Sequence, residues 1–159
     1  LHWGKVYRIP VVSLRLFNVY GPRARSSGTY GAVFGVFLAQ KLNDQPFTVV
    51  GDGTQTRDFI HAADLSRAVV QALERGPGGD VFQIGSGAPT SILELARLAQ
   101  EAANTRVEIR LAPSRTGDVQ QSYSDIRKAR EMLAWKPEIG LLEGLKDTWA
   151  WLCDARRGA

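Results

Sequence analysis

Two segments of this sequence carry groups suited to holding an anion. RLFNVYGPR occupies residues 15–23, and GDGTQTRDF occupies residues 51–59. Each segment places arginine and amide donors beside glycines, where the backbone can approach a ligand closely. An arginine guanidinium can donate paired hydrogen bonds to phosphate or carboxylate oxygens. The two segments therefore indicate a site for an anion such as a diphosphate.

A third arginine occurs in the segment APSRTGD, where Arg115 and Asp118 lie on either side of Gly117. The arginine could fork onto phosphate oxygens, and a carboxylate three residues later could accept hydrogen bonds from sugar hydroxyls. Taken alone, this triplet is typical of an ordinary surface loop. It gains interest because its chemistry matches that of the two segments above.

The glycine-rich run GDGTQTRD has competing interpretations. Its acidic residues suggest a calcium loop, but Arg57 interrupts the ligand positions, and Ala63 stands at the twelfth position from Asp52, where glutamate is required. A plain hairpin turn is the other interpretation. We favour contact with a ligand, because an arginine emerges from glycine turns next to the end of a predicted strand.

Groups that could catalyse a reaction are scarce. The sequence has two histidines, no serine in an elbow motif, and no cluster of His, Cys or carboxylate at metal-ligand spacing. His2 is expected at the surface. His61 is expected to be structural, with its ring bonded to a neighbouring loop, in preference to a role in proton transfer. We therefore assign no catalytic residue and no metal site to this chain.

The turn at residues 85–90, GSGAPT, imitates a dinucleotide-binding turn. It follows a predicted strand and precedes a predicted helix, as such a turn does. However, it lacks the final glycine and contains Pro89, and the strand after the helix ends without an acidic residue. We therefore interpret this turn as helix capping.

The composition is that of a globular domain. The 159 residues are enough to bury a core, and 44% are hydrophobic and 23% charged. No apolar run reaches the roughly 18 residues of a membrane span, and no basic-then-apolar leader is seen, so we expect a cytoplasmic protein without membrane contact. The net charge of +4 suits an anionic ligand, but the arginines are scattered, so we do not expect nucleic acid as a partner. The single cysteine, Cys153, excludes an internal disulfide and is expected to be inert.

Strands and helices alternate along the chain, which predicts α/β layering. The expected strands are residues 10–17, 47–50, 81–84 and 107–111, the first breaking at Asn18 into a glycine-proline turn. The expected helices are one ending near Arg8, one from Tyr30 to residues 44–46, one after Asp64, one capped by Thr90 or Ser91, one over 125–133 and one over 142–152. The inward positions of the helix after Asp64 are predicted to be Leu65, Ala68, Val69, Ala72 and Leu73.

With these motifs in order, essentially the whole chain resembles the C-terminal half of the extended short-chain dehydrogenase/reductases that act on nucleotide sugars. UDP-glucose 4-epimerases and related NDP-sugar epimerases and dehydratases are the most similar members. The matching motifs are RLFNVYGPR, PFTVVGDGTQTRDFIHAADLSRA, VFQIGSG, RTGDVQQSYSD, and AWKP followed by LLEGLKDTWAW.

The resemblance implies specific roles for residues at the ligand. Arg57 and Arg115 would grip the diphosphate of a nucleotide sugar, Asp118 would hold the ribose, and Asn18 would hydrogen-bond the diphosphate. The residues expected to line the nicotinamide side of an NAD pocket are Leu16, Phe17 and Val19. The residues expected beneath the nucleotide or beside its base are Gly31, Ala32, Val33, Val49 and Val50.

The resemblance also implies an organisation for the whole protein. Residues 1–30 would end a Rossmann-like dinucleotide-binding domain with its last parallel strands, and residues 31–159 would form most of the nucleotide-sugar-binding region. The glycine-rich dinucleotide turn and the Tyr-x-x-x-Lys pair of the family are not in this sequence. We therefore expect the substrate-binding half of an NAD-dependent UDP-hexose 4-epimerase, inactive without an N-terminal half and homodimeric when whole. A 4,6-dehydratase and a non-catalytic nucleotide-sugar-binding module remain the alternatives.

Overall fold

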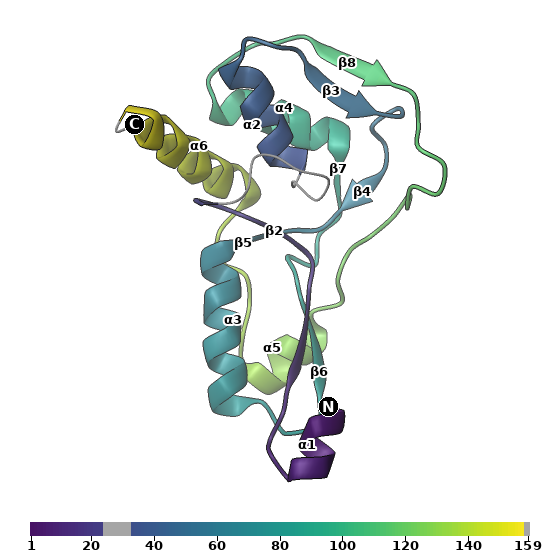
Figure 1. Ribbon diagram of the computed structural model, residues 1–159, viewed down its shortest axis with the longest axis vertical. Coiled ribbons are helices and arrows are strands. Elements are labelled where there is room, and N and C mark those ends of the chain that lie inside the picture. The colour runs from purple at the N-terminus through teal and green to yellow at the C-terminus, as the bar shows by residue number, and fades with distance from the viewer. Residues whose placement is uncertain (24–32, 158–159) are drawn as a thin grey trace.

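A computed structural model describes residues 1–23 and 33–157 of the chain (Figure 1). Helices and strands alternate, as the sequence predicts for an α/β protein. The helices are α1 His2–Tyr7, α2 Val33–Leu42, α3 Ala62–Arg75, α4 Ile92–Ala102, α5 Arg127–Leu133 and α6 Leu141–Arg157. The strands are β1 Ser13–Leu16, β2 Asn18–Tyr20, β3 Phe47–Val50, β4 Thr56–Arg57, β5 Phe59–His61, β6 Val81–Ile84, β7 Thr90–Ser91 and β8 Ile109–Ala112.

The strands pair across long sequence separations. Strands β1 and β6, β2 and β5, and β3 and β8 pair in parallel, whereas β4 and β7 are antiparallel. Parallel pairs need crossover connections, and helices α2 to α4 lie in those connections. The carboxyl ends of paired parallel strands lie side by side, so the loops that follow them meet.

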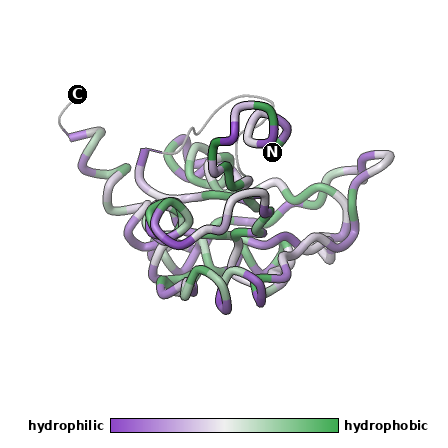
Figure 2. The backbone as a smooth tube through the Cα atoms, turned by 90° about the horizontal axis from the view of Figure 1, so that it is seen from below, coloured by the Kyte–Doolittle hydropathy of each residue, from purple (hydrophilic) through white to green (hydrophobic). Residues whose placement is uncertain are grey.

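The described residues form an upper and a lower body, joined where β2 and β5 run side by side (Figure 1). In the upper body, α4 packs against α2 and α6 around a core that includes Phe37, Phe47 and Leu95. In the lower body, α3, α5 and β6 enclose a core that includes Phe82, Leu133 and Trp135. Along the helices, hydrophobic and hydrophilic residues are interleaved (Figure 2), as helices with one buried face require. The predicted domain boundary near residue 30 stays a prediction, and both cores draw mainly on residues after it.

The first predicted strand was partly wrong. Strand β1 is shorter than residues 10–17, and the chain does not turn at Asn18 but continues as β2. The reason is a partner that the sequence pattern does not reveal: the backbone N–H of Asn18 donates to the carbonyl of Asp58 at 3.0 Å, and β2 then pairs with β5. The short strands β4, β5 and β7 were also not predicted, because strands of two or three residues leave little periodic signal.

The buried face of α3 differs from the predicted stripe. Ala68 and Ala72 are buried as expected, but Val69 is 49% exposed and Leu73 is 87% exposed. The buried positions of α3 are Asp64, Ala68 and Ala72, which recur every four residues, so Val69 and Leu73 fall outside this narrow buried face. The other predicted helices are present with shifted ends, and the predicted start of α2 at Tyr30 lies outside the described residues.

Helix α6 packs closely against the junction through Gly144. A Cβ atom at this position would meet the hydroxyl of Tyr20 and would lie 2.9 Å from Cδ2 of His61. Tyr20 and His61 are buried and contact each other edge to face, with ring centroids 5.4 Å apart. Burial, followed by the nearby carboxylates of Asp64, Glu143 and Asp147, raises the pKa of Tyr20, so its hydroxyl stays protonated.

We expect Gly144→Ala to lower the free energy of unfolding by about 1 to 3 kcal/mol, because the methyl group overpacks this contact. Gly140→Ala is the matched control, since a Cβ there would meet nothing within 4 Å. Urea denaturation followed by circular dichroism measures both changes. Equal stability of the two variants would contradict the close packing of α6.

Candidate functional site

A pocket of about 430 Å³ lies where the parallel strands β3 and β8 end. Val50 and Ala112 are register partners at these ends, so the loop at residues 51–55 meets the loop at residues 113–120. The pocket is lined by Val50, Gly51, Asp52, Gln55, Ala112, Ser114, Arg115, Asp118 and Gln120. Two of the motifs selected from the sequence, GDGTQTRD and RTGD, thus form one site.

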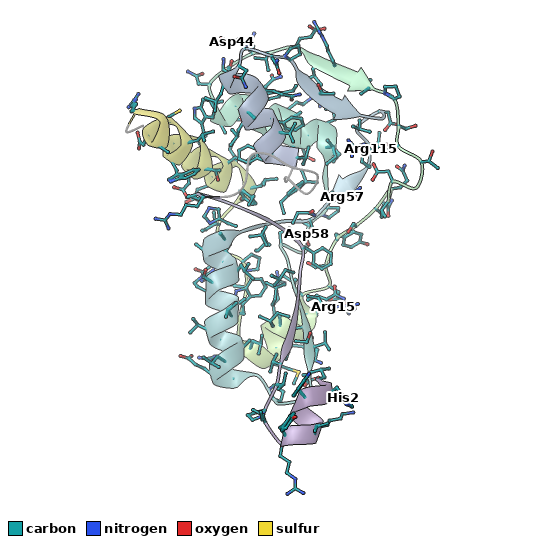
Figure 3. All side chains as sticks on the ribbon, viewed as in Figure 1. His2, Arg15, Asp44, Arg57, Asp58 and Arg115 are labelled. Atoms are coloured by element: carbon teal, nitrogen blue, oxygen red, sulfur yellow. The ribbon has the colours of Figure 1, made fainter. Side chains whose placement is uncertain are left out.

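Arg57 is held beside this pocket by Asp118. A guanidinium nitrogen of Arg57 donates to Oδ1 of Asp118 at 2.6 Å, and the other terminal nitrogen donates to the carbonyls of Thr56 at 2.7 Å and Val119 at 2.5 Å. Figure 3 shows Arg57 and Arg115 on the same side of the upper body. We call Arg57, Arg115 and Asp118 the clamp.

The loop that follows β3 is shaped by its own side chains. Gly51 and Gly53 have φ values of 71° and 77°, which favour glycine. The Asp52 carboxylate accepts hydrogen bonds from the backbone N–H and the hydroxyl of Thr54 at 2.9 and 2.7 Å. These bonds, the backbone one first, lower the pKa of Asp52, so a fixed negative charge stands at the rim of the pocket. Gln55 closes the turn by donating from Nε2 to the carbonyl of Val50 at 2.6 Å.

The first anion-binding segment reaches the site only indirectly. Arg15 lies exposed on β1 in the lower body, apart from the clamp (Figure 3). Asn18 is half-buried and donates from Nδ2 to the carbonyl of Asp58 at 2.9 Å. It therefore connects to the clamp through the residue that follows Arg57.

The remaining predicted contact residues occupy different surroundings. Val49 is fully buried in the upper core, so a ligand could meet only its backbone. Val33 begins α2 and is half-buried, whereas Gly31 and Ala32 lie outside the described residues. At the end of β1, 50% of Leu16 is exposed, and Phe17 and Val19 are half-buried.

The pocket also contains residues that the sequence reasoning missed, namely Gln55, Ser114 and Gln120. Gln55 and Ser114 lie within the two selected motifs. Their nearness in sequence to Arg57 and Arg115 could therefore have identified them as pocket residues. Gln120 is brought in by the backbone, because the N–H of Thr56 donates to its carbonyl at 2.8 Å. That bond aligns β4 with the loop from the other motif.

His61 has a structural role, as predicted, but its partners lie in α3 and α6 and not in a neighbouring loop. Its Nδ1 accepts a hydrogen bond from the backbone N–H of Ala63 at 3.3 Å, which caps the start of α3. Its Nε2 lies 3.4 Å from Oδ2 of Asp147 on α6. The ring therefore links two helices and is buried away from the clamp.

The turn at residues 85–87 binds a carboxylate of the protein itself, that of Asp58. The backbone N–H groups of Ser86 and Gly87 donate to the Asp58 carboxylate at 2.6 and 3.0 Å. The cap of α4 lies further on, where the Ser91 hydroxyl accepts from the N–H of Glu94 at 3.1 Å. Capping by Ser91 is confirmed, while the glycine turn itself donates hydrogen bonds to Asp58.

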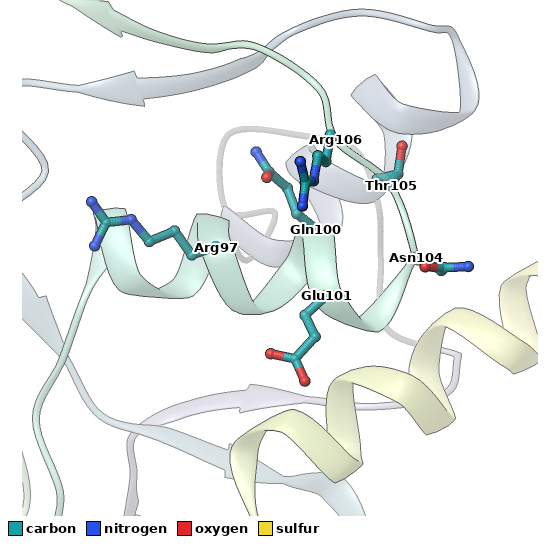
Figure 4. A pocket seen from close by; sticks show the side chains of 6 residues that line it. All are labelled: Arg97, Gln100, Glu101, Asn104, Thr105 and Arg106. Atoms are coloured by element: carbon teal, nitrogen blue, oxygen red, sulfur yellow. The ribbon is translucent and has the colours of Figure 1, made fainter.

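Another cleft, at the C-terminal end of α4, does not form a comparable site. It is lined by Arg97, Gln100, Glu101, Asn104, Thr105 and Arg106. Figure 4 shows that Arg97 points away from Gln100 and Arg106, while Glu101 extends toward α6. Its cationic groups therefore do not converge on one ligand position.

Two further features are absent from residues 1–23 and 33–157. There, no His, Cys, Asp or Glu side chains gather in groups that could hold a metal ion. None of the helices in this part of the chain combines the length and apolar character that crossing a bilayer demands.

Comparison with known proteins gives one consistent group. Residues 1–148 match the family model described as GDP-mannose 4,6 dehydratase. UDP-glucuronic acid decarboxylase 4 of Arabidopsis thaliana is 37% identical over 131 residues, which cover 82% of this chain and 29% of that protein. Among solved structures, UDP-glucose 4-epimerase from Thermotoga maritima with UDP-glucose has a TM-score of 0.91 and 34% identity, covering 98% of this chain and 50% of its own.

A second solved structure contains the dinucleotide as well as the sugar nucleotide. UDP-glucuronic acid 4-epimerase from Bacillus cereus, in complex with UDP-glucuronic acid and NAD, has a TM-score of 0.86 and 34% identity, covering 97% of this chain and 48% of its own. The chain therefore spans no more than half the length of these three proteins.

We expect Thr54→Val to raise the pKa of Asp52 part of the way toward its ordinary value, because the hydroxyl bond is lost while the backbone bond stays. Since the folded-state pKa of Asp52 is lowered, its contribution to stability is present above the ordinary pKa and is lost as pH falls through the lowered one. Carbon-detected NMR titration measures the pKa, with Thr48→Val as the control. An unchanged Asp52 pKa in Thr54→Val would contradict this role of the hydroxyl.

Proposed function

We propose a function from one premise: the chain belongs to the GDP-mannose 4,6 dehydratase family, whose relatives include NDP-sugar epimerases and decarboxylases. On that premise, it is the substrate-binding part of an NAD-dependent NDP-sugar epimerase, and its substrate is a UDP-hexose that is inverted at C4. The observation that carries the proposal is the clamp itself. Arg115 and Asp118 line a pocket large enough for a nucleotide at the ends of the parallel strands β3 and β8, and Arg57 on β4 forms an ion pair with Asp118.

Each clamp residue binds a different part of the ligand or shares one part with another clamp residue. Arg57 and Arg115 bind the diphosphate oxygens, for which a planar guanidinium is well matched. Asp118 accepts hydrogen bonds from the ribose hydroxyls. Asn18 adds an amide contact to the diphosphate, since Nδ2 has a second N–H to donate while the first binds the Asp58 carbonyl. The nucleotide base lies against the backbone at Val49 and Val50, with Val33 beneath it; the same role implied for Gly31 and Ala32 concerns residues outside the described part of the chain.

The residues at the end of β1 fit the nicotinamide part of NAD. Leu16 exposes an apolar side chain at the carboxyl end of a parallel strand, where cofactors of α/β proteins bind. Phe17 and Val19 continue this apolar wall. NAD, when bound, supplies the acceptor for a hydride from the sugar. This chain would hold the sugar nucleotide against that wall and exclude water.

Residues 1–159 would bind the nucleotide sugar without turning it over. The sequence contains no Tyr-x-x-x-Lys pair, and its histidine nearest the clamp, His61, is committed to capping α3. An N-terminal half would supply the proton-transfer groups, and the homodimer implied for the whole protein stays a prediction. Purified chain that epimerises UDP-glucose in the presence of NAD would overturn this part of the proposal.

A 4,6-dehydratase is the second candidate, and the name of the matching family model favours it. The clamp binds the part of the substrate that epimerases and dehydratases share, so product analysis on the full-length protein separates them. A 4-keto-6-deoxy sugar product would identify a dehydratase, and a C4 epimer would identify an epimerase. Clamp binding with neither product would indicate a binding module.

We expect Arg57→Ala and Arg115→Ala each to weaken UDP binding roughly 10- to 150-fold, because a charge-assisted hydrogen bond contributes about 1.5 to 3 kcal/mol. Arg97→Ala and Arg106→Ala are matched controls in the cleft of Figure 4 and should leave the affinity unchanged. Isothermal titration calorimetry with UDP measures all four variants.

Equal losses in all four variants would point to a general effect of charge and would refute the clamp. Salt-sensitive DNA binding by the wild-type chain, with no response to UDP, would favour a nucleic-acid-binding domain instead.

A further inference from the structure

The Asp58 carboxylate lies at the centre of the fold. Asp58 is fully buried and stands between Arg57 on β4 and Phe59 on β5. Figure 3 places it at the junction of the two bodies, just below Arg57. A buried carboxylate is costly unless hydrogen-bond donors surround it.

Donors from two distant segments satisfy this carboxylate. Its Oδ1 accepts from the backbone N–H and the hydroxyl of Ser86, each at 2.6 Å. Its Oδ2 accepts from the N–H of Gly87 and of Ser124, each at 3.0 Å, and from the Ser124 hydroxyl. Both oxygens are thus fixed in direction, and so is the chain on either side of Asp58.

The backbone of Asp58 fixes a third segment. Its carbonyl accepts from the N–H of Asn18 at 3.0 Å and from Asn18 Nδ2 at 2.9 Å. Residue 58 therefore joins the start of β2, the turn at residues 85–87 and the segment at Ser124. That last segment is the continuation of the loop that carries Arg115 and Asp118.

We propose that Asp58 is the positioning residue of the clamp: its buried carboxylate sets the direction of Arg57 and anchors the end of the loop that carries Arg115 and Asp118. This inference rests on the proposed function. Arg57 immediately precedes Asp58 in the chain, so a shift of the residue that bears the carboxylate also moves the residue that bears the guanidinium. Space for such a shift is small, because a Cβ on Gly85 would lie 2.6 Å from Oδ2 of Asp58.

Asp64 offers a matched comparison within the same stretch of chain. It too is fully buried, and it accepts hydrogen bonds from Arg67 and from the N–H groups of Glu138 and Ile139 at 3.1 and 3.0 Å. These partners join α3 to the segment before α6, away from the clamp. Loss of the Asp64 charge should therefore affect folding without redirecting Arg57.

The test measures UDP affinity and stability in Asp58→Asn and Asp64→Asn, at a temperature where circular dichroism shows both to be folded. We expect Asp58→Asn to weaken UDP binding about 10-fold or more, and Asp64→Asn to leave it within about 2-fold, although both lower the melting temperature. In the Asp58→Asn background, the further effect of Arg57→Ala should shrink to less than about 3-fold, because the guanidinium is already misdirected.

Ser124→Ala decides the question if Asp58→Asn does not fold, since it removes one donor and keeps the backbone bond. It should weaken UDP binding about 2- to 5-fold. Wild-type affinity in both variants, or full additivity of Asp58→Asn with Arg57→Ala, would overturn the positioning role while leaving the clamp intact. A wild-type chain that does not bind UDP would overturn the proposed function and this inference together.

Discussion

A carboxylate removed from water needs the protein to satisfy its lone pairs, and much of this structure is organised around meeting that need at Asp58. The donors come from residues 86–87 and from Ser124, two segments that are far apart in the sequence but lie next to each other at this carboxylate. The two apolar cores lie above and below this point. The hydrogen bonds of Asp58 therefore help to join the two bodies. Because hydrogen bonds are directional, they restrict the relative orientation of the bodies more than apolar contact alone could.

The clamp follows from the same geometry. Strands β3 and β8 bring two loops together at their carboxyl ends, and β4 places Arg57 beside the loop that carries Asp118. The bond from Thr56 to the carbonyl of Gln120 aligns these elements, and Ser124 fastens the end of the loop to Asp58. Flexible side chains thus project from a backbone that is fixed on either side. Such preorganisation lowers the entropy lost when a ligand binds.

The sequence predicted what depends on local pattern and missed what depends on distant partners. The α/β architecture, strand β3, strand β6 and the cap at Ser91 carry strong local signals, and the structure has them. The continuation of the chain into β2 could not be predicted, because it depends on Asp58, forty residues away. Likewise, nothing in the sequence near Asp58 marks it as buried, since its partners arrive through folding. The proximity of Arg57, Arg115 and Asp118 could be anticipated because motif resemblance records three-dimensional proximity that spacing alone does not.

The ion pair between Arg57 and Asp118 also affects which molecules the pocket can distinguish. An anion that takes the Arg57 donor now bound to Asp118 competes with that carboxylate for the guanidinium. Inorganic phosphate could replace the contact to Arg57 but would leave Asp118 without a donor, and its net gain would be small. A molecule with both a diphosphate and neighbouring hydroxyls supplies an acceptor to one partner and donors to the other. On the proposed function, the pair would therefore favour molecules that supply both groups over simple phosphates.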